Sequence, residues 1–507
     1  MRFIEGTPRN QSMLLPASLD EYVDTDNEVR SIDLFVNCLD LEQMGFALKK
    51  MDNGRPAYHP AVLLKLYLYG YLNGIRSSRA LERECKRNVE VMWLLQELKP
   101  DHNTINSFRK ENGTAIKQVF RSTVSIARHF NLIGGKLIAG DSTKLRAQNS
   151  KKNNFNQKKV ARHLAYIDEK LEQYRSELAA ADGDDEKEHL KGQIAQQKKR
   201  RKRYKEIGAA LQASGEDQMS VSDPDSRQMI IRNNITEVAY NVQSVNDAKH
   251  CLPIDYEVTQ HNDSKALGPM MERTSRILGH TKFTALLDKG YHTGSELKAA
   301  QQMGITTIVA IPDIPSASMA PDPAYNVSNF TYHPRKHCYT CPEGHTLTTN
   351  GNWYSKTSRN RSVQVQHFKT KACKTCPMIN SCTKNTGGRG RVIERTEHQD
   401  AIDRNRRNVE RKEHLYKRRQ AIIEHTYGTI KRGWNFHYIL TKKYLHRASA
   451  DVGLIFTAYN LKRMINMLGP DTLREYLTSL SGHFYLIWRP LIAAHRLHEP
   501  FPFFSSK

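Results

Sequence analysis

Hydrophobic and polar positions follow different patterns in successive parts of this 507-residue chain. From about residue 32 to residue 129, apolar residues recur every three or four positions, which is the spacing of amphipathic helices. From Gly135 onward, short apolar runs bounded by glycine and small polar residues predict buried strands, with helical stretches between several of them. Strands that alternate with helices indicate an α/β sheet, here preceded by a helical domain.

A charged segment with helical spacing, residues 155–210, interrupts the predicted strands. Residues 180–185 are rich in Asp and Gly and break it, which predicts two helices in an antiparallel hairpin. The second helix carries six consecutive basic residues, among them Lys198, Arg200 and Arg201. Such a run forms either a solvated helix face or a contact with the phosphates of a nucleic acid.

A second interruption, residues 312–400, is rich in proline and contains five of the eight cysteines. Two Cys-x-x-Cys pairs in one segment are typical of a zinc site, because tetrahedral Zn²⁺ takes four soft ligands from two turns. On spacing alone, the ligands would be Cys338, Cys341, Cys373 and Cys376. The remaining candidates are Cys382, His337 and His345. No Asp or Glu occurs between Gly344 and Ile393, which indicates a surface that faces nucleic acid.

Three acidic residues lie in settings that suit metal binding. Asp141 and Asp288 each end an apolar run, so either could bind a metal at the rim of a sheet or simply cap a turn. Glu424 lies on a late predicted helix, with Lys431 two turns further on the same face. Carboxylates are the ligands that Mg²⁺ prefers, and two ions about 3.5–4 Å apart promote displacement at a phosphodiester. Asp263 is a fourth acid behind a strand, read as a helix cap in preference to a site residue.

The charge of the chain points to a polyanionic partner. Lysine and arginine exceed aspartate and glutamate by 24, and such an excess favours nucleic acid over other ligands. We expect no membrane association, because no apolar run reaches the roughly 18–20 residues of a spanning helix and the first residues lack the apolar core of a signal peptide. Cysteines grouped for metal binding fit a reducing cytosol.

The acidic motifs together resemble those of the DDE transposases of bacterial insertion sequences. Asp141 matches the first Asp of that family in a GxDST-like strand end, and Asp288 matches the second in an Asp-x-Gly-Tyr motif. A signature of Tyr, Arg, Glu and Lys surrounds the family's glutamate, and its Arg-to-Glu interval is one residue longer here. The matching residues of this signature are Tyr416, Arg419, Glu424 and Lys431.

The resemblance implies an α/β fold with an RNase H-like catalytic core, a mixed sheet flanked by helices. It implies a DNA-binding role for the N-terminal helices, of helix-turn-helix kind, although these helices could instead only pack on the core. The expected domains are an N-terminal helical domain (1–130), the first part of the core (131–311) with its basic hairpin insertion (155–210), a zinc-ribbon-like insertion (312–400), the last part of the core with Glu424 (401–468), and a C-terminal tail (469–507).

The implied activity is cleavage of transposon ends and joining of the freed 3′-OH to target DNA, with Asp141, Asp288 and Glu424 holding two Mg²⁺ or Mn²⁺ ions. The family pattern names Cys341, Cys373, Cys376 and Cys382 as ligands of a structural zinc. The resemblance also implies a homodimer on paired ends, acting in the bacterial cytoplasm at the nucleoid. Alternatives are an inactive DNA-binding protein of the same ancestry and a nuclease without strand transfer. Residues expected at the DNA are Tyr416, Arg419, Lys431 and Arg432, with Trp434 read as core packing.

Overall fold

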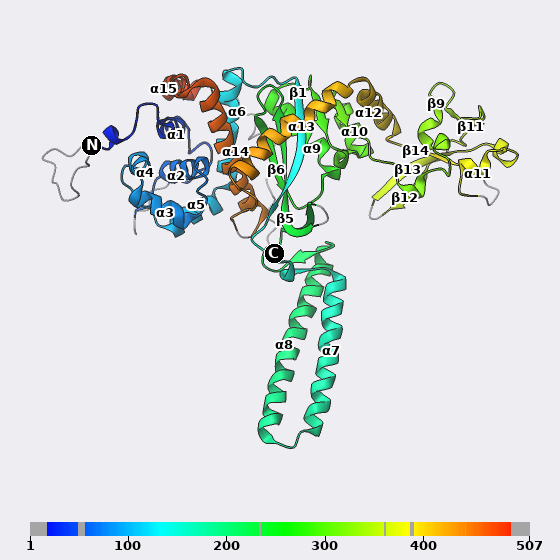
Figure 1. Ribbon diagram of the computed structural model, residues 1–507, viewed down its shortest axis with the longest axis horizontal. Helices are drawn as coiled ribbons and strands as arrows, with labels where there is room; N and C mark the ends of the chain where they lie inside the picture. The colour runs from blue at the N-terminus through cyan, green and yellow to red at the C-terminus, as the bar shows by residue number, and fades with distance from the viewer. Residues whose placement is uncertain are drawn as a thin grey trace, which may run out of the picture.

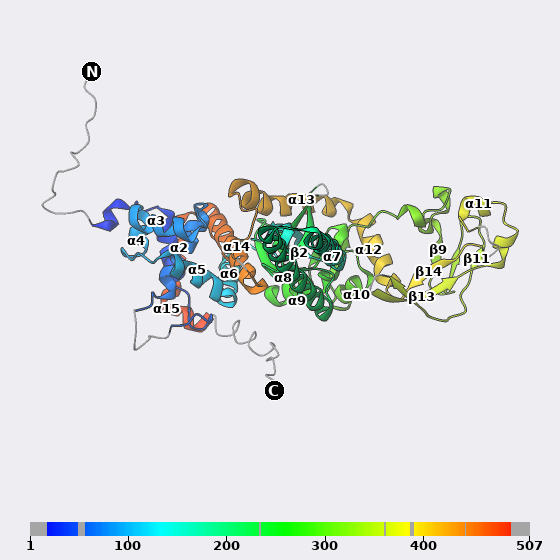
Figure 2. The same ribbon diagram turned by 90° about the horizontal axis from the view of Figure 1, so that it is seen from below.

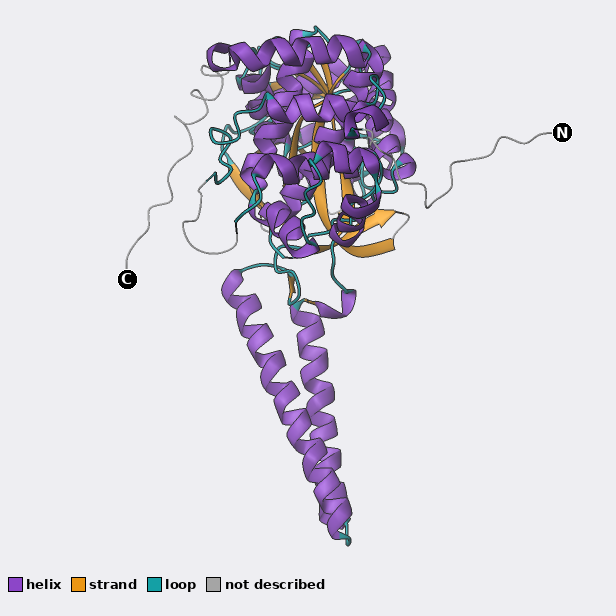
Figure 3. Ribbon diagram, turned by 90° about the vertical axis from the view of Figure 1, so that its left-hand side faces the viewer, coloured by secondary structure: helices purple, strands orange, loops and turns teal. Residues whose placement is uncertain are grey.

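The computed structural model describes residues 18–48, 56–232, 235–358, 361–385, 390–441 and 443–487. N-terminal helices, a central sheet and a Cys-rich module follow one another along the long axis (Figures 1 and 2). A pair of long helices projects from the central part as an arm (Figure 3). Of the expected C-terminal tail (469–507), residues 488–507 lie outside the described residues.

The N-terminal helices surround α2, which is apolar at most positions and buried along nearly its whole length. His59 caps α2 and Pro60 begins it, which places proline where its missing N–H costs no hydrogen bond. The helices of this part are α1 (Glu28–Asn37), α2 (Pro60–Leu72), α3 (Ser78–Arg87), α4 (Val89–Leu94), α5 (His102–Glu111) and α6 (Gly113–His129).

The central sheet has the order β4-β5-β1-β7-β8, with β6 also paired to β5. Antiparallel pairing joins β4, β5 and β6. β1 is antiparallel to β5 but parallel to β7, and β7 is parallel to β8, so the sheet is mixed. The strands are β1 (Leu137–Arg146), β4 (Arg227–Arg232), β5 (Ile235–Asp247), β6 (Pro253–Thr259), β7 (Thr284–Leu287) and β8 (Thr306–Val309).

Helices cover both faces of this sheet. On one face, Ile422 and Ile423 of α13 (Glu413–Gly428) pack with the strand residues Ala139, Leu286 and Ile308. α9 (Leu267–Leu278) and α10 (Gly294–Gln302) belong to the larger hydrophobic cluster on the other face. α12 (Gln399–Arg411) fastens the edge strand, because the Asn405 amide bonds both the N–H and the C=O of Val309 at 2.9 and 2.8 Å.

α14 (Leu445–Leu468) lies between the N-terminal helices and the sheet (Figure 1) and is buried on nearly all sides. One continuous hydrophobic cluster therefore includes residues from Val23 to Leu480. α15 (Pro470–Ile487) returns to the N-terminal part, where Arg474 donates to the backbone C=O of Thr25. No helix in the described parts of the chain is long and apolar enough to cross a membrane.

The arm consists of α7 (Gln157–Ala180) and α8 (Asp184–Ser214), which lie side by side (Figures 1 and 3). Ile167, Leu171 and Ile194 form a small seam between the two helices. At the base, β2 (Asn154–Phe155) pairs with β3 (Met219–Ser220), so both ends of the arm leave the core together.

The Cys-rich module contains two three-stranded sheets. Its own hydrophobic cluster includes Tyr339, Leu347, Phe368 and Ile393. Its elements are β9 (Thr331–His333), β10 (Cys338–Thr340), β11 (Thr346–Leu347), β12 (Tyr354–Ser358), β13 (Arg361–Phe368), α11 (Ile379–Cys382) and β14 (Ile393–Thr396).

Candidate active site

Asp141 and Asp288 lie at the end of the parallel ladder between β1 and β7. The last paired residues are Ala139 and Leu286, and Asp288 follows β7 directly. Asp141 differs from the prediction because it does not end its strand: β1 continues to Arg146, paired to β5 throughout. The sequence shows only that the apolar run stops, whereas β5 supplies backbone partners that extend the strand beyond it.

A glycine next to Asp141 lets β1 pass close to the helix below it. A Cβ on Gly140 would lie 2.9 Å from the Sδ of Met270 on α9 and 3.1 Å from Leu287. Both distances are shorter than normal van der Waals contacts, so a larger residue at this position would require the Met270 and Leu287 side chains to shift. Gly140 therefore contributes to the placement of the Asp141 carboxylate relative to Asp288.

Arg419 on α13 pairs with Asp141. Its Nη1 lies 2.8 Å from Oδ2 of Asp141, and both side chains are largely buried, with exposed fractions of 17% and 23%. Burial raises the pKa of Asp141 above its usual value, and the Asp288 charge adds to this, while Arg419 and the Ser142 N–H oppose it. The Arg419 side chain is predicted from the sequence to contact DNA, and in the structure it forms an ion pair with Asp141.

Asp288 begins a short turn that leads into Tyr291. Its carboxylate accepts the N–H of Lys289 at 2.7 Å, as a helix-capping residue does. Burial raises the pKa of Tyr416, and the Asp288 charge adds to this while Arg419 opposes it. The capping role and the site role coexist, because one carboxylate oxygen suffices for the cap.

Glu424 has an exposed side chain and accepts a hydrogen bond from Gln420 at 2.8 Å. One turn further along α13, the hydroxyl of Tyr427 lies 3.5 Å from the backbone C=O of Asp141, so this part of the helix borders the site. The prediction that Lys431 lies on the same regular helix is wrong. α13 ends at Gly428, and Lys431 follows in a π-helical turn, which changes the direction of its side chain.

Lys431 nevertheless points to the sheet. Its Nζ lies 3.4 Å from the backbone C=O of Lys144 on β1, and burial together with the Lys144 charge lowers its pKa. Arg432 is exposed, Tyr416 lies beside Arg419, and Trp434 packs on Phe436 with ring centroids 5.5 Å apart. Of these residues, Lys431 lies close enough to Asp141 for the carboxylate charge to act on it.

Asp263 lies closer to this site than its sequence position suggested. Asn262, and not Asp263, caps the short turn there. The Asp263 carboxylate accepts the Asn241 amide at 2.8 Å, lies 3.5 Å from Lys144, and adjoins Gly290 of the turn after Asp288. Lys144 was not predicted as a residue of this site. Its position three residues after Asp141, in the same motif, was the signal in the sequence that could have identified it.

The carboxylates are not arranged as a closed metal site. Within the described ranges, no three side chains of His, Cys, Asp or Glu stand where they could hold one ion. Their chemistry still fits a hard cation, because two carboxylates come together where the parallel pairing of β1 and β7 ends, and Asp141 already pairs with the guanidinium of Arg419. Asp141, Asp288 and Glu424 are the residues that could hold Mg²⁺.

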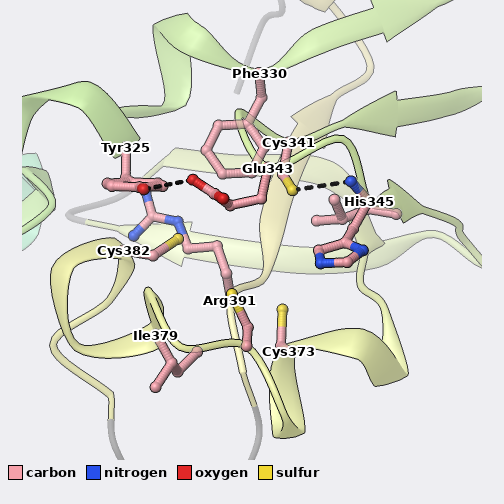
Figure 4. A pocket seen from close by; sticks show the side chains of 11 residues that line it. Tyr325, Phe330, Cys341, Glu343, His345, Cys373, Ile379, Cys382 and Arg391 are labelled. Atoms are coloured by element: carbon pink, nitrogen blue, oxygen red, sulfur yellow. Dashed lines mark hydrogen bonds between the residues drawn. The ribbon is translucent and has the colours of Figure 1, made fainter.

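Four cysteines line one small cavity of the Cys-rich module (Figure 4). They are Cys341, Cys373, Cys376 and Cys382, and His345 also lines the cavity. The volume of about 20 Å³ admits one water-sized occupant. Cys338 does not line the cavity but is buried on β10, and His337 bonds Tyr332 and Gln366. Cys382 thus lines the cavity and Cys338 does not, although no three of the described His, Cys, Asp or Glu side chains stand where they could hold one ion.

The predicted cations of the arm lie on α8. Arg201 pairs with Asp168 of α7 at 2.6 Å, and Arg200 donates to Gln197 at 3.2 Å. Lys198 is exposed. The arm therefore presents some of its basic run to solvent and uses part of it to join its two helices.

If this site cleaves DNA with a cation bound to Asp141, the cleavage rate should fall on acidification at a higher pH than an ordinary Asp would cause, because the Asp141 carboxyl must be ionised to bind the cation and its pKa is raised. Arg419→Gln removes a charge that lowers this pKa, so the acid limb should move to higher pH. The measurement is the rate at limiting Mg²⁺ across mildly acidic to neutral pH. An acid limb that stays at the same pH in Arg419→Gln would contradict this assignment.

Comparison with known families matches two parts of the chain. Residues 17–111 match a family described as Transposase domain (DUF772), and residues 340–465 match one described as Transposase DDE domain. Searches of curated proteins and of solved structures gave no significant match. The first match covers α1 to α5, and the second covers the four cysteines of the cavity, α13 and most of α14. Together they show transposase domains in these two parts of the chain and support an insertion-sequence DDE transposase.

Proposed function

We propose that this DNA transposase cleaves the ends of its transposon and joins the freed 3′-OH to target DNA by metal-dependent transesterification. The observation that carries the proposal is the meeting of Asp141 and Asp288 where the parallel pairing of β1 and β7 ends, beside the helix of Glu424. The mixed sheet with helices on both faces supports an RNase H-like core around them.

In this proposal, Asp141, Asp288 and Glu424 hold two Mg²⁺ or Mn²⁺ ions. The ions would activate the attacking water or 3′-OH and stabilise the leaving oxygen of the phosphodiester. Arg419 would leave Asp141 for a DNA phosphate when the cation arrives, since a guanidinium binds either anion in a bidentate way. Lys431 and Arg432 would hold the flanking phosphates, and Tyr416 would lie beside the cut.

We propose the domain division given above and a homodimer on paired transposon ends. The N-terminal helices would bind the terminal repeats, and the arm would contact DNA phosphates through Lys198 and neighbouring cations, without sequence preference. The N-terminal helices share a hydrophobic cluster with α14 and the sheet, so they would carry bound DNA in a defined position relative to the core. The site of action would be the cytoplasm of a bacterium, at the nucleoid.

The cysteine cavity would hold a structural zinc. We expect purified protein to contain about one zinc per chain, and Cys382→Ser to reduce this to near zero with a lower melting temperature, because a four-ligand site loses a thiolate. Cys338→Ser is the matched control and should keep its zinc, since Cys338 does not line the cavity. The measurement is the zinc content of each purified protein by elemental analysis. Loss of zinc in Cys338→Ser but not in Cys382→Ser would favour the ligand set predicted from spacing alone, which includes Cys338.

The alternative is a protein that binds DNA but does not cut it. The Asp141–Arg419 pair and the lack of three clustered ligands among the described residues are the observations that favour it. The test is incubation of wild-type protein with DNA carrying the element's ends, with Mg²⁺, Mn²⁺ or a chelator. Cleavage with either metal but not with chelator supports the proposal, whereas binding without cleavage favours the alternative. Cleavage without joining to a second DNA would indicate a nuclease.

A further inference from the structure

Two aromatic side chains stand exposed at the start of β12 in the Cys-rich module. The exposed fraction is 50% for Trp353 and 40% for Tyr354. Tryptophan is highly buried on average, because its ring is large and apolar. Residues 351–357 are all exposed, so within the part of the chain that the structure describes this edge of the module is open to solvent. Both rings are therefore accessible to a partner.

The ring of Tyr354 is held in place from two directions. It stacks on His367 of β13, with ring centroids 4.8 Å apart and an angle of 10° between planes, and its hydroxyl accepts the Asn350 amide at 2.9 Å. Tyr354 pairs with Val365, and strand alternation puts Lys356 on the same side of the sheet. A flat π-surface is therefore already formed, and little ordering would be needed before another ring stacks on it.

The positive charges around this surface favour an anionic partner. Between Gly344 and Ile393 there are nine lysines and arginines and no acid. The acid nearest to the surface is Glu394, which pairs with Lys356 and lies 3.9 Å from His367. Lys369 follows β13, is exposed, and by alternation lies on the side of His367. A protein partner would also accept exposed aromatics, but a segment without acids matches a polyanion better.

We propose that Trp353 and Tyr354, consecutive exposed residues at the start of the edge strand β12, with His367 and Lys369 on the side of Tyr354, form an aromatic surface that binds an unpaired stretch of DNA by base stacking. Aromatic rings within a basic surface are what proteins use for single strands, because every base has a π-face while the cations hold the backbone. Paired bases already stack on one another, so a duplex has no free ring to offer. That the strand comes from an opened transposon end rests on the proposed function.

The test measures binding of the full chain to single-stranded oligo(dT) and to a duplex of equal length by fluorescence anisotropy. Trp353→Ala should weaken binding to oligo(dT) about tenfold, since one stacked base contributes roughly 1–3 kcal/mol and 1.4 kcal/mol is tenfold. Duplex binding should change less than about twofold. Trp353→Phe should retain most of the affinity because it keeps a ring.

Met319→Ala is the matched control, because Met319 is 40% exposed in the same module but lies outside its acid-free segment. Oligo(dT) binding by Trp353→Ala that equals wild type, or an equal loss for duplex and single strand, would overturn the proposal. Metal-dependent cleavage of end DNA is measured separately. If wild type does not cut but Trp353→Ala loses oligo(dT) binding, the proposed function fails while the aromatic surface stands. If wild type cuts normally but Trp353→Ala binds oligo(dT) as wild type does, the proposed function stands and the aromatic surface fails.

Discussion

Asp288→Ala is expected to lower metal-dependent cleavage of end DNA by about 10³-fold or more, a loss of roughly 4 kcal/mol of transition-state stabilisation. The variant loses a carboxylate at the point where β7 ends beside Asp141. DNA binding should persist, because affinity for DNA comes chiefly from cations on phosphates. The measurement is single-turnover cleavage together with the Kd for the same DNA.

Asp313→Ala provides the control for this experiment. Asp313 is 91% exposed and pairs with Lys289, next to Asp288 in sequence, so its removal alters local charge without touching the strand end. Since Asp288 also caps a turn, Asp288→Asn should be tested beside Asp288→Ala to separate folding from chemistry. Cleavage that survives in Asp288→Ala would remove Asp288 from the site, and equal loss in Asp313→Ala would point to a general charge effect.

Asp451→Ala is expected to destabilise the fold by about 3–5 kcal/mol, the cost of leaving a buried charge without its partner. Asp451 on α14 is fully buried, with Arg76 at 2.6 Å and Arg109 at 3.4 Å. Burial alone would raise the pKa of Asp451, but both arginines and bonds from Tyr71 and the Leu440 N–H lower it. The measurement is urea unfolding of wild type and variant at neutral pH.

The pH dependence gives a second readout of the same group. An Asp with a lowered pKa stabilises the fold above its unfolded pKa, and this stability is lost as the pH falls through the folded value. Wild type should therefore lose stability on acidification, while the difference from Asp451→Ala shrinks. Asp471→Ala is the control, because Asp471 is 77% exposed and pairs only along its own helix. A variant of Asp451 no less stable than this control would refute the role of the buried pair.

The network at Asp451 also connects parts that are distant in sequence. Arg76 comes from the N-terminal helices and lies over the ring of Phe436, with its guanidinium carbon 4.4 Å from the centroid. The segment of Phe436 leads on to Ile439, whose N–H bonds the C=O of Arg146 at the end of β1. The helices matched as a transposase domain are thus joined to the strand of Asp141. Weakening this link should loosen the whole molecule, so unfolding is the appropriate measurement.

Local patterns in the sequence predicted much of the fold. The apolar run before Asp288, the charged hairpin around residues 180–185 and the three strands before Thr259 have their predicted element types, since period and turn residues act over a few positions. The predictions were wrong where contacts with residues distant in sequence, or an irregular turn, determine the local structure. β1 runs past Asp141 because β5 pairs with it, and Lys431 leaves the helix of Glu424 through a π-turn that no spacing rule indicated.

The sequence by itself determined which residues are acidic, basic or thiol-bearing at motif spacing, and so which chemistry the chain can perform. The tertiary structure decided their partners. It placed Arg419 on Asp141 across 278 positions, brought Asp263 to the turn of Asp288, and gathered Cys382 with Cys341 instead of Cys338. The physical reason is range: motifs and periodicity act within a few residues, whereas burial and charge pairing depend on which surfaces meet when the chain folds.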